Sequence, residues 1–294
     1  MGRALMKFWQ SMSWAETEQH CAVACLAEEL GFEGLIGADH ALYPETMRPD
    51  YPYSKTGVPP QTASSEYPDM WTISAAMAAV TERVKFVCGV YVLPLRNPIE
   101  VAKQAATLSK LSRGRFILGA GAGWMREEFD IYGVDFESRG RRMDEMIDVM
   151  RGLWTGEMFE FHGEFFDFDR IVVSPKPSHP IPLYFGGAAP IALRRTARLG
   201  DGWIGAGNTP EEVPVLMAEL ERLRDEAGRR DVSFETLVGV YAEPDVDLFR
   251  RLEDSGMTSG VHLPFSFAFD GPSSIEQKTR LMETFAERVI RHFQ

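Results

Sequence analysis

The stretch that decides the fold is Val84–Trp124, VKFVCGVYVLPLRNPIEVAKQAATLSKLSRGRFILGAGAGW. It opens with an apolar run, Val84–Leu93, which is typical of a strand covered on both faces. Asn97 and Pro98 then predict the start of a helix, because asparagine caps a helix N-terminus well and proline fits its first position. A second short buried strand, Phe116–Gly119, follows that helix. Two buried strands joined by one helix predict a parallel βαβ unit.

The same alternation of strand and helix recurs along the chain. We expect strands at Leu5–Gln10, Glu33–Gly37, Val84–Leu93, Phe116–Gly119, Leu183–Phe185, Trp203–Gly205, Phe234–Tyr241 and Gly260–Leu263. Each of them is followed by a helical segment, and no gap is long enough to hold a domain boundary. The pattern therefore predicts one α/β domain over residues 1–294, a (β/α)8 TIM barrel whose functional residues lie at the C-terminal ends of its strands.

Two inserted segments interrupt this pattern. The first is an aromatic and proline-rich loop from Leu42 to Pro68, and loops of such length inside a compact fold usually carry function. The second, Met158–Phe168, alternates about His162-Gly163 and predicts a hairpin. Between Phe129 and Arg139 we expect irregular structure, followed by a helix at Arg141–Trp154.

Composition and charge narrow the class of protein. The 294 residues suit one large barrel or two ordinary domains, and a hydrophobic content of 45% excludes global disorder. The net charge of −12 disfavours nucleic acid and anionic membranes as partners. The chain has no apolar run long enough to span a membrane and no apolar signal core, so we expect a cytoplasmic protein. Three cysteines do not make a disulfide framework.

Asp39 and His40 stand at the C-terminal end of the second expected strand, where a barrel exposes its functional residues. A histidine there can donate or accept a proton near neutral pH, so both residues are candidates for catalysis. The alternative is that they only cap and close a loop. No ligand spacing such as HExxH surrounds His40, and the other histidines are scattered, so we expect no metal site.

Two glycine-rich turns follow expected strands. The spacing in Gly119–Gly123 departs from a Rossmann fingerprint, which would need glycine at Trp124, but alternating glycines offer a flat backbone that a ring can approach closely. The alternative is a simple tight turn. At Gly186–Ala188, free N–H groups before a helix favour an anion such as phosphate, with Arg194 and Arg195 further along that helix. The alternative is a glycine turn beside solvated arginines.

Aromatic residues gather at the end of the first expected strand and in the long loop. They are Trp9, Tyr43, Tyr51, Tyr53, Tyr67 and Trp71. Such residues can line an apolar pocket over a planar cofactor, and they can equally pack the loop onto the barrel. For the substrate pocket we expect Trp9, Tyr43 and Trp71.

Taken together, these features make the chain resemble the luciferase-like monooxygenase superfamily, and within it the branch of oxidoreductases that depend on coenzyme F420. The matching segments follow one another in family order: Ala27–His40, Val90–Phe116, Leu118–Phe129, Gly140–Trp154 and Pro182–Trp203. The resemblance implies a barrel that holds a flavin or deazaflavin at its C-terminal mouth, with Asp39 and His40 beside the reacting edge of the ring.

The resemblance also implies the remaining parts of the cofactor site. A non-proline cis peptide after the third strand, expected at Tyr91-Val92, would support the middle ring and leave the other face to the substrate. The phosphate loop would be Gly186-Gly187. The implied cofactor-binding residues are Asp39, His40, Tyr91, Val92, Gly121, Ala122, Gly123, Gly186, Gly187 and Ala188.

The implied function is hydride transfer between coenzyme F420 and a small organic substrate, with His40 as proton donor or acceptor. The alternative is a monooxygenase that uses reduced FMN and oxygen, which needs a reductase partner and a dry pocket. A third hypothesis is a non-catalytic flavin-binding barrel. Arg126, Arg141 and Arg142 can meet the acidic tail of F420 or be ordinary surface charges. The resemblance also allows a homodimer.

Two departures from the family pattern bear on the substrate. Some F420-dependent sugar-phosphate dehydrogenases place a glutamate where this chain has Trp124, and a tryptophan where it has Pro44. These two departures argue against a sugar phosphate as the substrate. The aromatic loop instead suggests an uncharged, fairly hydrophobic substrate.

Overall fold

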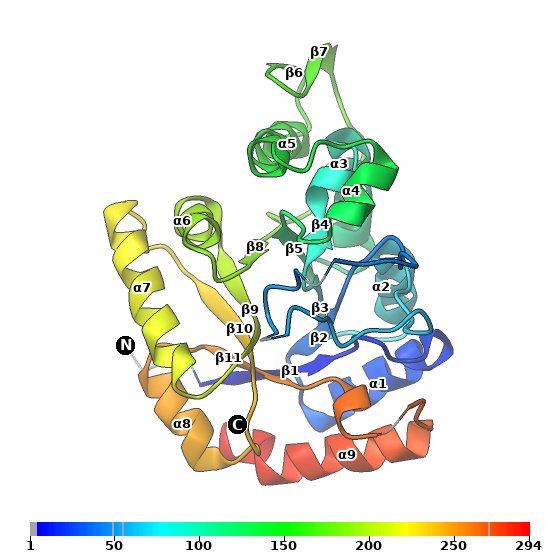
Figure 1. Ribbon diagram of the computed structural model, residues 1–294, viewed down its shortest axis with the longest axis vertical. Helices are drawn as coiled ribbons and strands as arrows, with labels where there is room; N and C mark the ends of the chain where they lie inside the picture. The colour runs from blue at the N-terminus through cyan, green and yellow to red at the C-terminus, as the bar shows by residue number, and fades with distance from the viewer. Residues whose placement is uncertain (1–4, 49, 55, 270) are drawn as a thin grey trace.

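A computed structural model describes residues 5–48, 50–54, 56–269 and 271–294. Its centre is a parallel sheet that closes on itself (Figure 1). The barrel strands are β1 (Lys7–Ser11), β2 (Gly34–Gly37), β3 (Lys85–Cys88), β5 (Phe116–Gly121), β8 (Leu183–Gly186), β9 (Gly202–Asn208), β10 (Glu235–Val240) and β11 (Ser259–His262). β3 pairs with β5 and β1 pairs with β11, so the last strand closes on the first. The predicted (β/α)8 barrel is confirmed.

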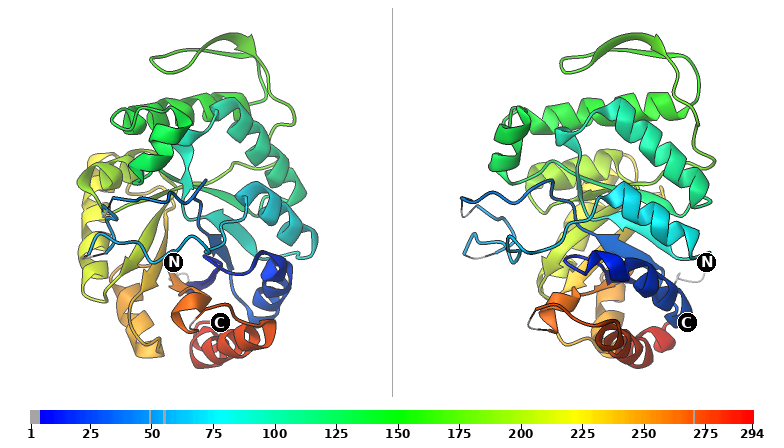
Figure 2. Two further views of the ribbon diagram at one scale, coloured as in Figure 1. Left: turned by 45° about the vertical axis from the view of Figure 1, so that its right-hand side comes forward. Right: turned by 90° about the vertical axis from the view of Figure 1, so that its right-hand side faces the viewer.

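Helices pack around the outside of the barrel (Figure 1 and Figure 2). They include α1 (His20–Leu30), α2 (Met70–Ala79), α3 (Pro98–Leu111), α5 (Arg139–Trp154), α6 (Pro190–Leu199), α7 (Glu212–Glu226), α8 (Val246–Asp254) and α9 (Ile275–Arg288). Asn97 caps α3 by accepting a hydrogen bond from the Ile99 N–H, as predicted. Within the described ranges, no helix combines the length and the apolar character needed to cross a bilayer.

Each barrel strand contributes one side chain to the apolar interior. These residues are Trp9, Ile36, Val87, Ile117, Tyr184, Ile204, Leu237 and Val261. Because successive side chains of a strand point to opposite faces, their neighbours pack outward against the helices. Phe8, for example, contacts Phe249 and Phe285 in the outer layer.

The predicted strand Val84–Leu93 is interrupted after Cys88, where β3 ends. A short strand β4 (Tyr91–Val92) then pairs with β5. The non-proline cis peptide lies at Gly89-Val90, so the prediction that placed it at Tyr91-Val92 is wrong. Position 89 requires glycine, because a side chain there would overlap Ile36 of the neighbouring strand.

A helix, α4 (Arg126–Tyr132), occupies part of the segment Phe129–Arg139 that was expected to be irregular. Its first turn carries Glu127 and Glu128, whose negative charges suit the positive end of the helix dipole. Its Phe129 is fully buried in a small apolar cluster. The prediction failed because this one apolar anchor gives too little periodicity to indicate a helix.

Both inserted segments are present. The predicted hairpin is confirmed as β6 (Phe159–His162) and β7 (Asp167–Ile171), which pair antiparallel and project beyond α5 (Figure 2). The described part of the loop 42–68 reaches the C-terminal mouth of the barrel. There, the ring of Tyr51 lies 5.1 Å from that of Trp124, which follows β5.

Candidate active site

His40 follows β2 at the C-terminal mouth, and a carboxylate holds its ring. Its Nδ1 lies 3.1 Å from Oε2 of Glu128, whose other oxygen accepts a hydrogen bond of 2.7 Å from the Ala41 N–H. The exposed fraction is 12% for the His40 side chain and 0% for that of Glu128. Because Glu128 engages Nδ1, any proton exchange with a bound molecule falls to Nε2.

Sequence reasoning missed Glu128. The glutamate was sought at Trp124, directly after the glycine turn, whereas the structure supplies one from the first turn of α4. The sequence signal that could have indicated it is the pair Glu127-Glu128. Adjacent residues of a helix point in different directions, so one of two neighbouring acidic residues can face the site. Glu127 faces outward and accepts a hydrogen bond from the Arg48 N–H, which leaves Glu128 to point inward.

The Asp39 side chain bonds to Val92 in β4 and to Arg96, which follows β4. Its carboxylate oxygens lie 3.1 and 3.2 Å from Nη2 of Arg96, and Oδ2 accepts a hydrogen bond of 3.0 Å from the Val92 N–H. Burial raises the pKa of Asp39, while Arg96 and the Val92 N–H act in the opposite direction. Because both oxygens already have partners, this arrangement favours anchoring of the segment that carries His40; proton transfer by Asp39 stays a prediction.

Aromatic rings surround the His40 imidazole. The rings of Tyr67 and Trp124 form T-shaped pairs with the imidazole, at centroid distances of 5.2 and 5.7 Å. Trp14 donates a hydrogen bond of 2.6 Å to the Tyr67 hydroxyl. Burial raises the pKa of Tyr67, so its hydroxyl stays neutral at physiological pH. His40 is therefore surrounded largely by aromatic rings, with the Glu128 carboxylate against its Nδ1 and the paired Asp39 and Arg96 nearby.

Val90 occupies the position at the mouth that was expected for Tyr91 and Val92. It is half-buried on the interior cluster, and a side chain at Gly121 or Gly186 would overlap it. Tyr91 and Val92 are instead buried in the outer layers of the barrel. Their roles as cofactor contacts stay a prediction, and Val90 is the residue of this segment that packs on the barrel interior.

The two glycine turns lie on either side of Val90. The first comprises Gly121, Ala122 and Gly123, and Gly123 has a φ of +83° in a place where a side chain would overlap Phe129. In the second, Gly187 has a φ of +105° and its carbonyl accepts a hydrogen bond of 3.0 Å from Trp203. Ala188 is exposed, and no side chain caps the first turn of α6 that follows.

The arginines proposed for anion binding are engaged elsewhere. Arg195 is buried and its Nε lies 2.6 Å from Asp144 of α5, so it is not the solvated side chain of the alternative, and its part in anion binding stays a prediction. Arg194 is exposed on α6, where its charge acts on Glu219 of α7. The other three also have protein partners: Arg126 pairs with Glu137, Arg141 with Glu164, and Arg142 donates to the Pro94 carbonyl.

The three residues predicted for the substrate pocket lie apart. Trp9 is 2% exposed inside the barrel, because β1 extends to Ser11 and leaves Trp9 in the middle of the strand. Trp71 lies on α2, donates a hydrogen bond to the Tyr91 hydroxyl and packs on Phe116, outside the barrel. Neither lines the mouth. Tyr43 is 42% exposed in the loop that follows His40, and its role stays a prediction.

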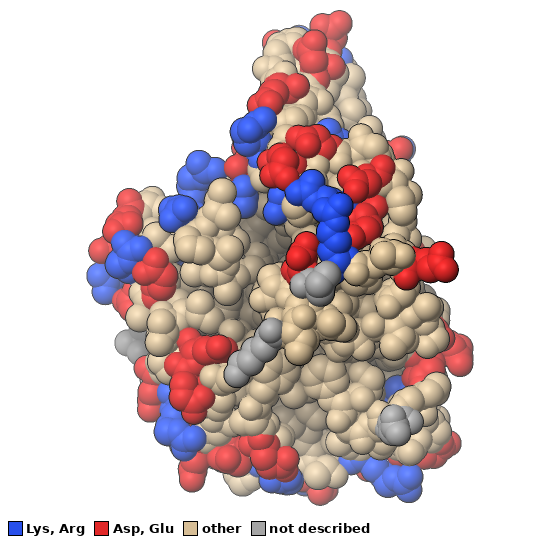
Figure 3. Space-filling view, in the orientation of Figure 1, with Lys and Arg blue, Asp and Glu red and all other residues tan. Residues whose placement is uncertain are grey.

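The mouth has the features that a flat cofactor with a phosphate-bearing tail requires. Figure 3 shows a hollow between α6 and the loop 42–68, and both basic and acidic side chains lie above it. Gly121 and Gly186 leave room for the Val90 side chain, which lies against the backbone of both turns. No side chain caps the start of α6; Pro190 has no N–H and the N–H groups of Ala192 and Leu193 donate to the Ala189 carbonyl, which leaves the Ile191 N–H to face an anion. No group of three or more His, Cys, Asp or Glu side chains in the described ranges could hold a metal ion.

Comparisons with known proteins agree with this geometry. A family model described as luciferase-like monooxygenase matches residues 6–252. An uncharacterised protein of Mycobacterium tuberculosis (strain ATCC 25618 / H37Rv) is 38% identical over 288 residues, which are 97% of this chain and 99% of that protein. The F420-dependent glucose-6-phosphate dehydrogenase of Nakamurella multipartita is 30% identical over 249 residues, covering 82% of this chain and 68% of the dehydrogenase. In fold, monooxygenase RslO1 from Streptomyces bottropensis matches with a TM-score of 0.78 at 20% identity, covering 98% of this chain and 100% of RslO1.

Proposed function

The chain belongs to the luciferase-like monooxygenase family, and from this premise we propose that it is an oxidoreductase that transfers a hydride between coenzyme F420 and a small uncharged substrate. The substrate would be an alcohol, a carbonyl compound or an activated alkene. The observation that carries the proposal is the buried pair His40–Glu128 at the mouth. The similarity to an F420-dependent dehydrogenase supports the choice of cofactor.

In this proposal His40 moves the proton that accompanies the hydride. With Glu128 as acceptor, Nδ1 carries the ring proton and Nε2 presents a lone pair, so Nε2 can take the proton of an alcohol. The imidazolium that results lies 3.1 Å from the Glu128 carboxylate, which stabilises its positive charge. In the reverse direction the same Nε2–H returns a proton to the oxygen or carbon of the reduced product.

Asp39 and Arg96 act as positioning residues. Their ion pair fixes the segment after β2 to the segment after β4, and the Val92 N–H adds a second link. This holds the backbone of His40 while Glu128 holds its ring. A proton carrier that is fixed at both points loses little entropy on meeting its substrate.

The deazaflavin would be held by two parts of the mouth. Val90, with Gly121 and Gly186 beside it, would support the ring, and the Gly187–Ala188 turn with the start of α6 would bind the phosphate. When bound, the cofactor supplies or accepts the hydride at its own ring carbon.

The charges at the mouth favour an uncharged substrate. Arg96 is paired with Asp39, and Arg195 is paired with Asp144, so neither is available for a substrate anion. The rings around His40 offer apolar contact surface. A small alcohol or ketone would therefore bind better than a sugar phosphate.

Cofactor titration followed by a substrate panel tests the proposal. We expect F420 to bind with higher affinity than FMN, measured by the fluorescence of each cofactor. F420 absorbance would then be followed with alcohols, ketones and enones. His40→Ala should retain F420 affinity and lose about 100-fold or more in turnover, while His179→Ala, at an exposed position, should behave as the parent.

Three results would contradict the proposal. Tight FMN binding without F420 binding would instead favour the FMN-dependent monooxygenase. Equal turnover of His40→Ala and the parent would remove His40 from proton transfer. Binding of F420 without conversion of any tested substrate would favour a non-catalytic barrel.

A further inference from the structure

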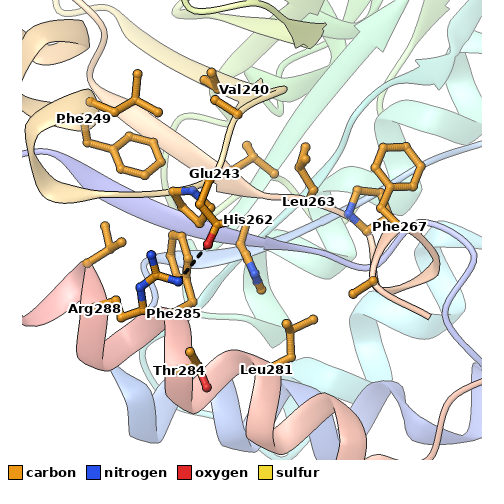
Figure 4. A pocket seen from close by; sticks show the side chains of 17 residues that line it. Val240, Glu243, Phe249, His262, Leu263, Phe267, Leu281, Thr284, Phe285 and Arg288 are labelled. Carbon is orange, nitrogen blue, oxygen red and sulfur yellow. Dashed lines mark hydrogen bonds and ion pairs between the residues drawn. The ribbon is translucent and has the colours of Figure 1, made fainter.

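A second cavity lies outside the barrel, between the C-terminal ends of β10 and β11 and helices α8 and α9 (Figure 4). Its volume is about 240 Å³. Most of its wall is apolar and includes Val240, Leu248, Phe249, Leu281, Phe285 and Val289. A dry cavity of about 150 Å³ is enough to hold benzene, so this one accommodates a single ring with a small substituent.

His262 places one polar ring in this apolar wall. Along β11, Val261 belongs to the barrel interior, so the next residue points outward. The imidazole of His262 stacks on Phe285 with the ring centroids 4.3 Å apart, and Figure 4 shows it extending toward α9. The His262 side chain is half-buried, and a polar ring in an otherwise apolar wall is a site for a specific hydrogen bond.

The tautomer of His262 is fixed by a buried glutamine. Nε2 of Gln10 donates a hydrogen bond of 2.7 Å to the Ser11 carbonyl, which turns Oε1 of Gln10 toward His262. Oε1 lies 2.6 Å from Nδ1 of His262 and can only accept, so Nδ1 carries the ring proton. Burial also lowers the pKa of His262 to about 4, so the ring is neutral at pH 7. Nε2 is therefore a lone-pair acceptor, and none of the described residues donates to it.

The charges at the cavity also limit its ligand. Arg288 is the one cationic side chain among the described lining residues, and it lies 2.8 Å from Glu243 in an ion pair at the edge. An anionic ligand would have to break this pair, and a cationic ligand would find Glu243 already neutralised. The cavity therefore suits a molecule without net charge.

We infer that this cavity binds a small neutral molecule with an apolar ring and one hydroxyl or N–H donor, which bonds to Nε2 of His262. The cavity lies on the outer side of β11, because His262 points away from the barrel interior. Phe267 at its edge stacks on Trp14, which in turn bonds to Tyr67 beside His40, so a chain of aromatic side chains connects the cavity with the mouth. The inference does not depend on the proposed function. It assigns the protein a second, non-catalytic binding site.

Phenol and toluene test this inference as a matched pair, because they have nearly the same shape and only phenol has a donor. Binding is measured by isothermal calorimetry and by ligand-observed NMR on the full chain. We expect the parent to bind phenol about tenfold more tightly than toluene, since only phenol can donate a hydrogen bond to Nε2 of His262 and toluene covers that atom without a partner. His262→Leu should lower phenol affinity to the level of toluene and leave toluene affinity within about threefold.

Leu281→Trp provides a second variant that fills the cavity from its half-buried edge, and it should abolish the binding of both probes. Circular dichroism and thermal melting show that each variant is folded. The inference is overturned if the parent binds neither probe saturably or binds both equally. It is also overturned if phenol affinity survives unchanged in His262→Leu or in Leu281→Trp, because the bound molecule would then lie elsewhere.

Discussion

Replacement of Glu128 by glutamine tests how the histidine at the mouth is held. In the parent, one Glu128 oxygen accepts from the Ala41 N–H and the other faces Nδ1 of His40. The glutamine would keep its oxygen on Ala41 and turn its NH₂ group toward Nδ1. Because that group can only donate, the ring proton of His40 would move to Nε2, and Nε2 would lose its lone pair. The variant should therefore fold normally and still lack a proton acceptor.

The structure also sets the size of the effect. Two unit charges 3.1 Å apart attract each other by about 5 kcal/mol at an effective dielectric constant of about 20. The side chains are 12% and 0% exposed, so solvent screens this attraction little. Glu128→Gln removes it from the imidazolium that forms during proton transfer. We expect turnover to fall about 10³- to 10⁴-fold.

Single-turnover kinetics with F420 and an alcohol measure this loss, with cofactor affinity determined separately by fluorescence. Glu127→Gln is the matched control, because it makes the same change one residue earlier, where the side chain faces outward toward Arg48. It should keep turnover within about threefold of the parent. Turnover of Glu128→Gln that equals that of Glu127→Gln, at unchanged cofactor affinity, would refute the assigned role.

Three further changes probe other parts of the molecule. Gly121→Ala introduces a methyl group that overlaps Val90, so F420 affinity should fall at least about tenfold in a fluorescence titration, and Val90→Ala should restore part of it. Lys278→Met removes a fully buried ammonium that pairs with Glu16, and urea unfolding should show a loss of about 3–5 kcal/mol, because the carboxylate is left unpaired. The third is a change of pH: because burial lowers the pKa of His262 to about 4 from 6.5, the unfolded chain binds that proton first as the pH falls. The free energy of unfolding should therefore drop by about 2 kcal/mol between pH 7 and pH 5 through this group, measured as the difference between the parent and His262→Asn.

Matched controls separate these effects from general damage. Lys103→Met changes an exposed lysine and should leave the free energy of unfolding within about 0.5 kcal/mol of the parent. A Gly121→Ala variant with full F420 affinity would show that the ring does not lie against Val90. Identical pH dependence in the parent and in His262→Asn would mean that His262 has the same pKa in the folded and unfolded chains. The buried His20 is present in both proteins, so its titration cancels in this difference.

The barrel could be predicted because its signals are local. Asn97, Pro98 and the apolar runs on either side of them specify a cap, a helix and two buried strands within a short stretch of sequence. Repetition of that pattern then leaves few topologies to consider. The position of His40 just after a predicted strand was likewise enough to identify it as a candidate site residue.

The details that failed depend on contacts between distant segments. Glu128 reaches His40 only because α4 folds back over the mouth, 88 residues further along the chain. Trp9 was assigned to the mouth because the predicted strand ended one residue too early, and in a barrel the position along the strand decides between core and mouth. The cis peptide was misplaced by two residues, and the close approach of Gly89 to Ile36 of the neighbouring strand is another contact that the local sequence does not reveal.

The bond between Gln10 and His262 joins residues 252 positions apart and spans the junction of the first and last strands. Such a contact closes a very long loop, so chain entropy opposes it until other contacts have ordered the segments between. The pocket next to His262 is therefore assembled only in the completed barrel. A partly folded chain, with β11 still detached, would have no tautomer-fixed imidazole to offer, so occupancy of that pocket would report that the ring of strands has closed.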